Sequence, residues 1–369
     1  MRKKRVCVVS AYAYIKEYIN YGSLLQYYAL EKCLKKMDYE PYWLRYRIEN
    51  EKKWKDKVKR KIKILFNVKG EKRKSNILYD FSEFIKENLS VSEHEYYSEE
   101  ELERNIPEAD YYITGSDQVW AACNPVNYLC FAPNEKRKIS YAASFGKAEI
   151  SDDHLMTIKP WLKKFDYISV REKSGVNICN MIGVNAECVV DPTLLLNKEE
   201  YPYSEKYKNQ KYVLCYFLNI QNEKDFPSEI IRNSAIDKNV KVVAGVNQRD
   251  DFVQSEYLEY FSPEDWLGAY NYADCIFTNS FHGTVFALIF HKPFIVFFQK
   301  GKSKKQNERM LSLLQMLNLE DRIYDEDNGI DKILENEIDW EKIDDILKKK
   351  KINSIKFLKK SCEYEEIKR

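Results

Sequence analysis

The sequence has no apolar run that approaches the length needed to cross a membrane, about 18 residues. Its first residues, MRKKRVCVVSAY, carry a basic flank but only a short apolar stretch, which predicts a β-strand rather than a signal peptide. The nine cysteines form no CxxC pair and no Cys/His cluster at zinc spacing. Several lie in strand-like apolar runs, so we expect buried reduced thiols, no bound metal and a cytoplasmic protein.

Neither sign of charge is in large excess, because 60 Lys and Arg residues oppose 58 Asp and Glu residues. A dedicated nucleic-acid binder is usually more one-sided, so we expect no nucleic-acid partner. One stretch, residues 49–75, is rich in lysine. It predicts either a solvated helix face, which we favour, or a basic surface with aromatic residues in peripheral contact with an anionic membrane.

Length and periodicity predict two domains of the α/β class. The 369 residues exceed the usual size of one domain, and 44% of them are hydrophobic. Short β-rich runs alternate with helical periods, which is typical of mostly parallel sheets, although no GxGxxG follows the first strand. We predict a Rossmann-like domain over 1–196, a linker over 197–210, a second Rossmann-like domain over 211–335 and a C-terminal helix over 336–369. The two domains are expected to face one another across a cleft.

Several predicted strands of the first domain end in small or charged residues. These ends are Gly115-Ser116-Asp117, Ser144-Phe145-Gly146, Arg171-Glu172 and Asp191-Pro192-Thr193. In open α/β sheets, ligands bind outside the carboxyl ends of the strands, so we expect these loops to converge on one edge. Asp191 stands before a proline, and we expect it to shape a turn.

The segment TNSFHGTVFALIFHKPF, residues 278–294, puts a histidine at the start of an apolar helix. Asn279 and Ser280 are residue types that favour the N-cap, so His282 falls in the first helical turn, near exposed backbone N–H groups. Gly283 permits close approach of an anion there. His282 is therefore either a reactive group at a ligand site or a buried histidine satisfied by a neighbouring carbonyl.

Seven segments, taken in order, resemble the polysaccharide pyruvyl transferase family. They are NYGSLLQYYAL (20–30), ITGSDQVW (113–120), SYAASFG (140–146), DYISVREKSG (166–175), VVDPTLLL (189–196), TNSFHGTVFALIFHKPF (278–294) and NERMLSLLQMLNLEDR (307–322). The resemblance covers nearly the whole chain and implies a GT-B-like fold of two Rossmann-like domains. It implies an enzyme that moves the enolpyruvyl group of phosphoenolpyruvate (PEP) onto two sugar hydroxyls as a cyclic ketal. The implied acceptor is a surface-glycan precursor, lipid-linked at the inner face of the membrane, and the implied reaction requires no cofactor.

The implied reaction needs cations or helix N-termini for the two anionic groups of PEP, and an acid near its C3 atom. The resemblance assigns the acid to His282, with Ser280 and Gly283 beside the anion. Many relatives carry arginine where this chain has Phe281, so the cation is expected to come from elsewhere. Arg171 is the leading replacement, although a salt bridge with Glu172 or with another carboxylate is the alternative role. Asn307 and Arg309 are further PEP-binding candidates.

The acceptor hydroxyl needs a base, for which Asp117 is the candidate. The alternatives for Asp117 are an anchoring role for the sugar or an N-cap. Asn20, Gly22 and Gln26, at the turn after the first strand, are expected to line the acceptor side. Trp120 is a candidate to stack on a sugar ring, although core packing is the default role for such a residue. The competing functions are glycosyl transfer from a nucleotide sugar on the same fold and a non-catalytic subunit of a glycan-assembly complex.

Overall fold

The computed structural model describes most of the chain. It covers residues 2–10, 20–47, 81–220, 225–228, 239–243, 258–259, 261–327 and 329–363. The lysine-rich stretch 49–75 lies outside the described residues, so its two interpretations stay open. Among the described residues, no helix is both long and apolar enough to cross a bilayer.

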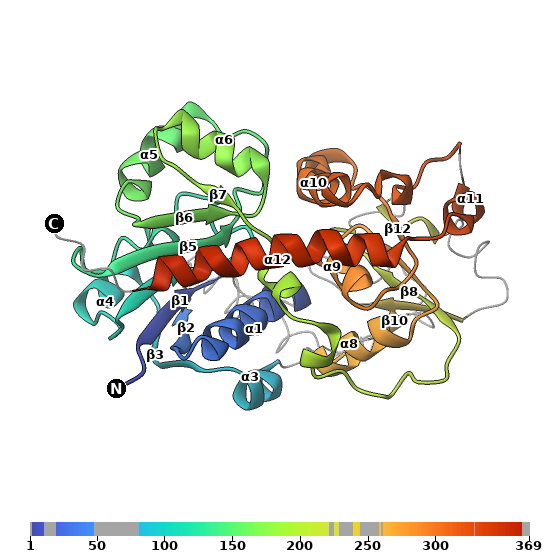
Figure 1. The fold of residues 1–369 in the computed structure, drawn as a ribbon, viewed down its shortest axis with the longest axis horizontal. Coiled ribbons are helices and arrows are strands. Elements are labelled where there is room, and N and C mark those ends of the chain that lie inside the picture. Colours follow the sequence, from blue (N-terminus) through green and yellow to red (C-terminus); the bar gives the residue numbers. More distant parts are fainter. Residues whose placement is uncertain are drawn as a thin grey trace, which may run out of the picture.

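The first half of the described chain forms a seven-stranded parallel sheet with the order β3-β2-β1-β4-β5-β6-β7 (Figure 1). The strands are β1 (Arg5–Val9), β2 (Glu40–Tyr46), β3 (Val91–Tyr96), β4 (Tyr111–Thr114), β5 (Arg137–Ala143), β6 (Tyr167–Val170) and β7 (Glu187–Cys188). Its helices are α1 (Tyr21–Lys36), α3 (Ser82–Asn88), α4 (Glu99–Arg104), α5 (Asp152–Leu162) and α6 (Lys173–Met181). Central strands such as β5 are buried along their whole length, as parallel strands covered on both faces must be.

The described part of the second half forms a five-stranded parallel sheet with the order β10-β9-β8-β11-β12. Its strands are β8 (Tyr212–Tyr216), β9 (Asn239–Val243), β10 (Leu258–Glu259), β11 (Cys275–Thr278) and β12 (Phe294–Val296). The helices after β10 are α8 (Pro263–Tyr272), α9 (Phe281–Ile289), α10 (Asn307–Leu317), α11 (Gly329–Glu335) and α12 (Trp340–Cys362). The predicted pair of parallel α/β sheets is confirmed.

The long helix α12 runs across both halves (Figure 1). Near its start, Trp340 stacks on His291 of the second half, with ring centroids 4.8 Å apart. Near its end, the Ser361 carbonyl accepts a hydrogen bond from Arg137 of β5 at 3.2 Å. Between them, Ser354 Oγ accepts from the Val190 N–H at 3.1 Å. This helix therefore ties the second half to the first sheet, next to the loop that carries Asp191.

The two halves also share an aromatic cluster. Tyr21, in the first turn of α1, stacks on Trp266 of α8, with ring centroids 5.0 Å apart and planes 7° apart. Tyr21 meets Tyr216 of β8 edge-on, and its hydroxyl donates to the Phe261 carbonyl at 2.7 Å. Apolar contact therefore fixes the first turn of α1 against the second half.

Both sheets reverse their strand order beside their first strand, between β1 and β4 and between β8 and β11. Such switch points open a crevice at the carboxyl ends of the strands, where ligands of doubly wound folds bind. The start of α1 follows β1, Asp117 follows β4, and His282 follows β11. The start of α1, Asp117 and His282 therefore lie at the switch points of the two sheets.

Candidate active site

The first turn of α9 presents His282 to the first half of the molecule. Ser280 is the N-cap, because its Oγ accepts a hydrogen bond from the Gly283 N–H at 3.3 Å. Asn279 stands outside the helix and pairs with the Leu218 backbone, accepting from its N–H at 2.7 Å. A Cβ atom at position 283 would lie 2.2 Å from Thr278 Oγ1. Glycine is thus required there for packing of α9 on β11.

The imidazole of His282 is 6% exposed and lies between Asp191 and Gly22. Its Nε2 atom is 3.5 Å from Asp191 Oδ2 and has no hydrogen-bond partner among the described residues. On the other edge of the ring, a Cβ atom at position 22 would lie 2.1 Å from Nδ1. Only glycine leaves room for this ring at the start of α1.

Asp191 is the most deeply buried carboxylate of the site, at 1% exposure. Its Oδ1 accepts from Thr193, both from the N–H at 3.0 Å and from the hydroxyl at 2.7 Å. Its Oδ2 accepts from Arg171 Nη1 at 2.7 Å and from Ser116 Oγ at 3.1 Å. Burial alone would raise the pKa of Asp191, but His282 and Arg171 outweigh it and hold the pKa well below its ordinary value. Asp191 therefore shapes the expected turn and is also ionised at the centre of a polar network.

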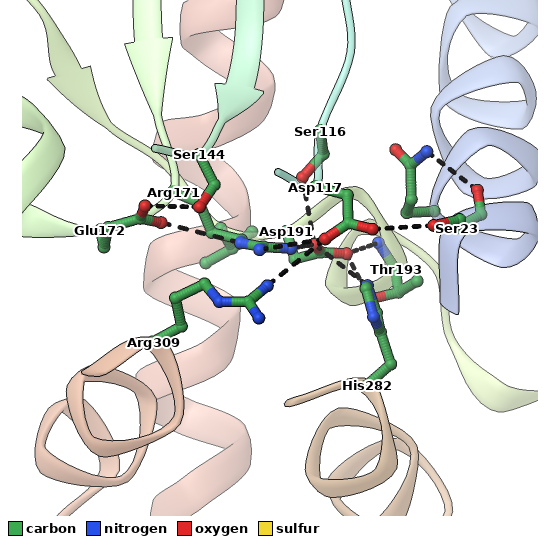
Figure 2. A network of polar contacts seen from close by, with 12 residues as sticks. Ser23, Ser116, Asp117, Ser144, Arg171, Glu172, Asp191, Thr193, His282 and Arg309 are labelled. Atoms are coloured by element: carbon green, nitrogen blue, oxygen red, sulfur yellow. Dashed lines mark hydrogen bonds and ion pairs between the residues drawn. The ribbon is translucent and has the colours of Figure 1, made fainter. Parts of the chain in front are cut away.

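Arg171 follows β6 and is surrounded by negative charge (Figure 2). Beyond its bond to Asp191, its Nη2 lies 3.5 Å from Asp117 Oδ1 and its Nε lies 3.8 Å from Glu172 Oε2. Its guanidinium carbon lies 4.3 Å from the centre of the Phe281 ring. Burial lowers the pKa of Arg171, but these carboxylates more than reverse the effect and raise it. The salt bridges predicted as an alternative for Arg171 are therefore present.

Arg309, on α10, is poorer in negative partners. Its Nη1 lies 3.4 Å from Asp117 Oδ1, the same oxygen that faces Arg171. The Gln118 amide oxygen, turned toward the guanidinium, accepts from Nη1 at 3.2 Å. Burial, together with repulsion from Arg171, lowers the pKa of Arg309 to about 10. Arg309 is therefore a buried cation whose counter-charge is incomplete.

Asp117 links α1 to both arginines. Its backbone is left-handed, with φ of 68°, and its Oδ2 accepts from Ser23 Oγ in the first turn of α1 at 2.8 Å. Burial raises the pKa of Asp117, but Arg171, His282 and Arg309 together lower it below its ordinary value. Asp117 is thus held as a carboxylate, shared by two guanidinium groups at contacts longer than 3.3 Å.

Figure 2 shows Arg309 and His282 reaching from the two helices of the second half toward Asp117, Asp191 and Arg171 of the first. The second half presents the Arg309 guanidinium, the His282 imidazole and a helix N-terminus, and the first half presents carboxylates, hydroxyls and the Arg171 guanidinium. Such a site can bind an anion and move protons. Among the described residues, no group of His, Cys, Asp or Glu side chains is arranged to hold a metal ion.

The family model of polysaccharide pyruvyl transferases matches residues 20–297. The chain belongs to the polysaccharide pyruvyl transferase family. Ser23, Asp117, Arg171, Asp191 and His282 lie within the matched range, and Arg309 lies beyond it. No curated protein sequence matches the chain.

Solved structures of low sequence identity share the fold over nearly the whole chain. A UDP-L-rhamnose complex of Arabidopsis thaliana UGT89C1 aligns with a TM-score of 0.53 and 8% identity, over 98% of this chain and all of that one. A putative UDP-N-acetylglucosamine 2-epimerase from Listeria monocytogenes gives 0.51 and 11%, over the full length of both. A variant of the wall teichoic acid polymerase TagF gives 0.51 and 13%, over 97% and 89%. The GT-B-like fold expected for this pyruvyl transferase is confirmed.

The predicted acceptor-side residues on α1 all belong to its first turns. Asn20 is the N-cap, since its Oδ1 accepts from the Ser23 N–H at 3.0 Å. Gly22 makes room for His282, as described above. Gln26 is buried and donates to the Ser23 carbonyl at 2.9 Å and to Ser10 Oγ. These contacts place all three beside the network, and their acceptor-binding role stays a prediction.

The side chains of two predicted site residues take no part in the network. Trp120 has no exposed surface and stacks on Tyr128, with ring centroids 5.4 Å apart. Its indole N–H donates to the Asn127 carbonyl, so it presents no face to a sugar, and core packing is the correct alternative. Asn307 exchanges hydrogen bonds of 2.9 Å with the Gln299 backbone and pins the loop after β12. Its side chain is therefore engaged within the second half.

Several members of the network were not among the predicted catalytic or binding residues: Ser23, Ser116, Ser144, Glu172, Asp191 and Thr193. Ser144 Oγ, for example, donates to Glu172 Oε1 at 2.6 Å, which fixes the carboxylate beside Arg171. All but Ser23 lie at the strand ends that the sequence had marked. Their small or acidic type just past a buried strand was the available signal.

Proposed function

We propose that the protein transfers the enolpyruvyl group of PEP onto two hydroxyls of a sugar in a surface-glycan precursor, forming a cyclic pyruvate ketal and releasing phosphate. Family membership supports pyruvyl transfer to a saccharide. The observation that carries the choice of PEP is the incomplete counter-charge of buried Arg309 beside Arg171 and the α9 N-terminus. No metal or redox cofactor is part of the proposed reaction.

The anion site of this proposal combines Arg171, Arg309 and the start of α9. Charge-assisted N–H···O bonds are normally about 2.7–2.9 Å long, so contacts of 3.4 and 3.5 Å to one Asp117 oxygen pair each guanidinium only loosely with this carboxylate. The Nε atoms of Arg171 and Arg309 have no hydrogen-bond partner in the described part of the chain. The phosphate and carboxylate of PEP would supply acceptors to these groups, with Ser280 and Gly283 contributing the helix turn beside them.

The chemistry proceeds in two additions at C2 of PEP. His282 donates a proton to C3 while an acceptor hydroxyl adds to C2, and Asp117 takes the proton of that hydroxyl. The π electrons of the C2–C3 bond form the new C3–H bond. The second hydroxyl then displaces phosphate at C2. Its proton passes to His282, the C2–O bond to phosphate breaks with its electron pair, and the leaving phosphate takes the proton held by Asp117.

Asp117 is a weak base while both arginines face it. Arg171 and Arg309 help to lower its pKa, so an anion that draws these guanidiniums away would raise its affinity for a proton. In this proposal PEP therefore activates the base that the acceptor hydroxyl needs. The acceptor lies on the α1 side of Asp117, near Asn20, Gly22 and Gln26.

The acceptor is proposed to be a lipid-linked saccharide, with the protein working in the cytoplasm at the inner membrane face. The test combines purified protein with PEP and a panel of lipid-linked galactosides. We expect phosphate release together with a product whose mass has gained a pyruvate ketal. Transfer from a nucleotide sugar without PEP would refute the proposal in favour of glycosyl transfer. Absence of any transfer and of PEP binding would favour a non-catalytic subunit.

A further inference from the structure

We infer that Asp191 is the positioning residue of the transfer site, because one carboxylate fixes both the imidazole of His282 and the guanidinium of Arg171. The inference rests on the proposed function, in which these two groups act as the acid and as a PEP-binding cation. It assigns a catalytic purpose to a residue whose position before Pro192 had indicated only a turn.

The carboxylate of Asp191 is itself immobile. Thr193 occupies Oδ1 through its N–H and its hydroxyl, and Ser116 donates to Oδ2 at 3.1 Å. The residue stands at the start of the 3-10 turn Pro192–Leu195, which packs against α1 and α12. The Asp191 carboxylate therefore keeps its position, since moving it would break buried hydrogen bonds.

The contact with His282 differs in kind from the contact with Arg171. Arg171 Nη1 makes a tight 2.7 Å bond to Oδ2, whereas His282 Nε2 stays 3.5 Å away and makes no hydrogen bond to any described residue. Nε2 is therefore near the carboxylate without being held by a short hydrogen bond, so it stays available to a substrate. An acid that must deliver its proton to substrate needs both properties.

The opposite edge of the imidazole is fixed by the start of α1. Because Gly22 has no side chain, Nδ1 fits beside it. A Cβ atom at position 22 would lie only 2.1 Å from Nδ1. We call Asp191 and Gly22 the imidazole clamp. Both belong to the first half, whereas His282 belongs to the second, so the first half determines where the proposed acid stands. The same Asp191 oxygen sets that position relative to Arg171.

The kinetic test is a double-mutant cycle between Asp191→Asn and His282→Gln in the PEP-dependent transfer assay. We expect Asp191→Asn to lower kcat at least about tenfold, and to raise KM for PEP through Arg171. In the His282→Gln background, its effect on kcat should shrink to about threefold or less, while the effect on KM persists. The matched control is Asp110→Asn, which removes a carboxylate bonded to the Arg5 N–H at the far end of β1 and should change neither constant.

A stability cycle tests the clamp without an activity assay. Gly22→Ala should lower Tm when His282 is present and should have little effect in a His282→Ala background, where the clashing ring is gone. Equal losses of Tm in both backgrounds would overturn the clamp. This test does not use Asp191→Asn, so it remains decisive if that variant fails to fold. If the wild type transfers from PEP but the effects of Asp191→Asn and His282→Gln on kcat multiply as independent effects do, the positioning role of Asp191 is refuted while the proposed function stands. If the wild type shows no PEP-dependent transfer, the proposed function fails and the catalytic purpose of Asp191 fails with it.

Discussion

Replacing Arg309 with methionine should stabilise the protein while removing its response to PEP. Burial and repulsion from Arg171 lower the pKa of Arg309 well below its ordinary value, to about 10, even with the attraction of Asp117 included. At about 1.4 kcal/mol per pKa unit, the charged form costs about 3 kcal/mol more in the folded protein than in water. Methionine removes the charge and retains an apolar stem near Phe281, so we expect a gain of about 1–3 kcal/mol.

The pH dependence of this gain follows from the sign of the shift. Arg309 is charged in the folded and unfolded states below pH 10, so the destabilisation is fully present there. The destabilisation fades as pH rises above about 10, because the folded state releases the proton before the unfolded state does. Thermal unfolding at pH 7–8 therefore measures the full effect. With unfolding entropy near 2.1 cal/mol/K per residue, 1–3 kcal/mol corresponds to about 1–4 °C in 369 residues.

The matched control is the same substitution at Arg171, which should act in the opposite direction. Asp191, Asp117 and Glu172 raise the pKa of Arg171, so its removal leaves buried carboxylates unpaired. Breaking a buried ion pair from one side costs about 3–5 kcal/mol. PEP should raise the Tm of the wild type by mass action and should leave the Tm of Arg309→Met unchanged. A stability loss in Arg309→Met would refute the assignment of Arg309 as an undercompensated cation, and a retained PEP response would remove it from the anion site.

Three further results are expected. His282→Ala should lower the kcat of transfer at least about a hundredfold while circular dichroism stays unchanged; wild-type turnover would end its assignment as the acid. The folded-state pKa values of Asp117 and Asp191 lie below 3.8, so the stability that their charged forms contribute is present above that pH and is lost as pH falls below it. The difference in unfolding free energy between wild type and Asp191→Asn should therefore narrow in acid, and a constant difference would contradict the ion pairing. Trp120→Ala should cost about 3–5 kcal/mol in denaturant unfolding with an unchanged KM for acceptor, and a selective rise in that KM would restore its stacking role.

The fold was predictable because its determinants are local. Runs such as RVCVV and YVLCY are short, apolar and followed by helical periods, which indicates parallel strands before any contact is known. The strand ends that carry Asp117, Arg171 and Asp191 could be recognised for the same reason. The N-cap Ser280 could also be read, since capping depends on a residue type at a helix start.

The partners of the site residues could not be predicted from the sequence. Nothing local to Gly22 indicates that an imidazole from residue 282 occupies the space of its missing side chain. Asp191 has the local signature of a turn, and its bonds to Arg171 and Ser116 arise from the sheet order. Trp120 was predicted at the sugar site but packs in the core, because a tryptophan near a predicted cleft is equally suited to either place. Long-range packing decides such roles, and the sequence pattern carries no signal for it.

The burial of so many charged groups between the two halves requires another source of stability. Removing charges from water costs several kcal/mol per ion, and the Asp117 contacts are too long to repay this fully. The aromatic cluster of Tyr21, Trp266 and Tyr216 lies in the same interface, and pairs of this kind contribute about 0.5–1.5 kcal/mol beyond their apolar burial. Tyr21 is adjacent to Gly22, so the contact that joins the halves also presents the imidazole clamp. Apolar packing thereby offsets the cost of a charge network whose incomplete pairing is what makes it receptive to an anion.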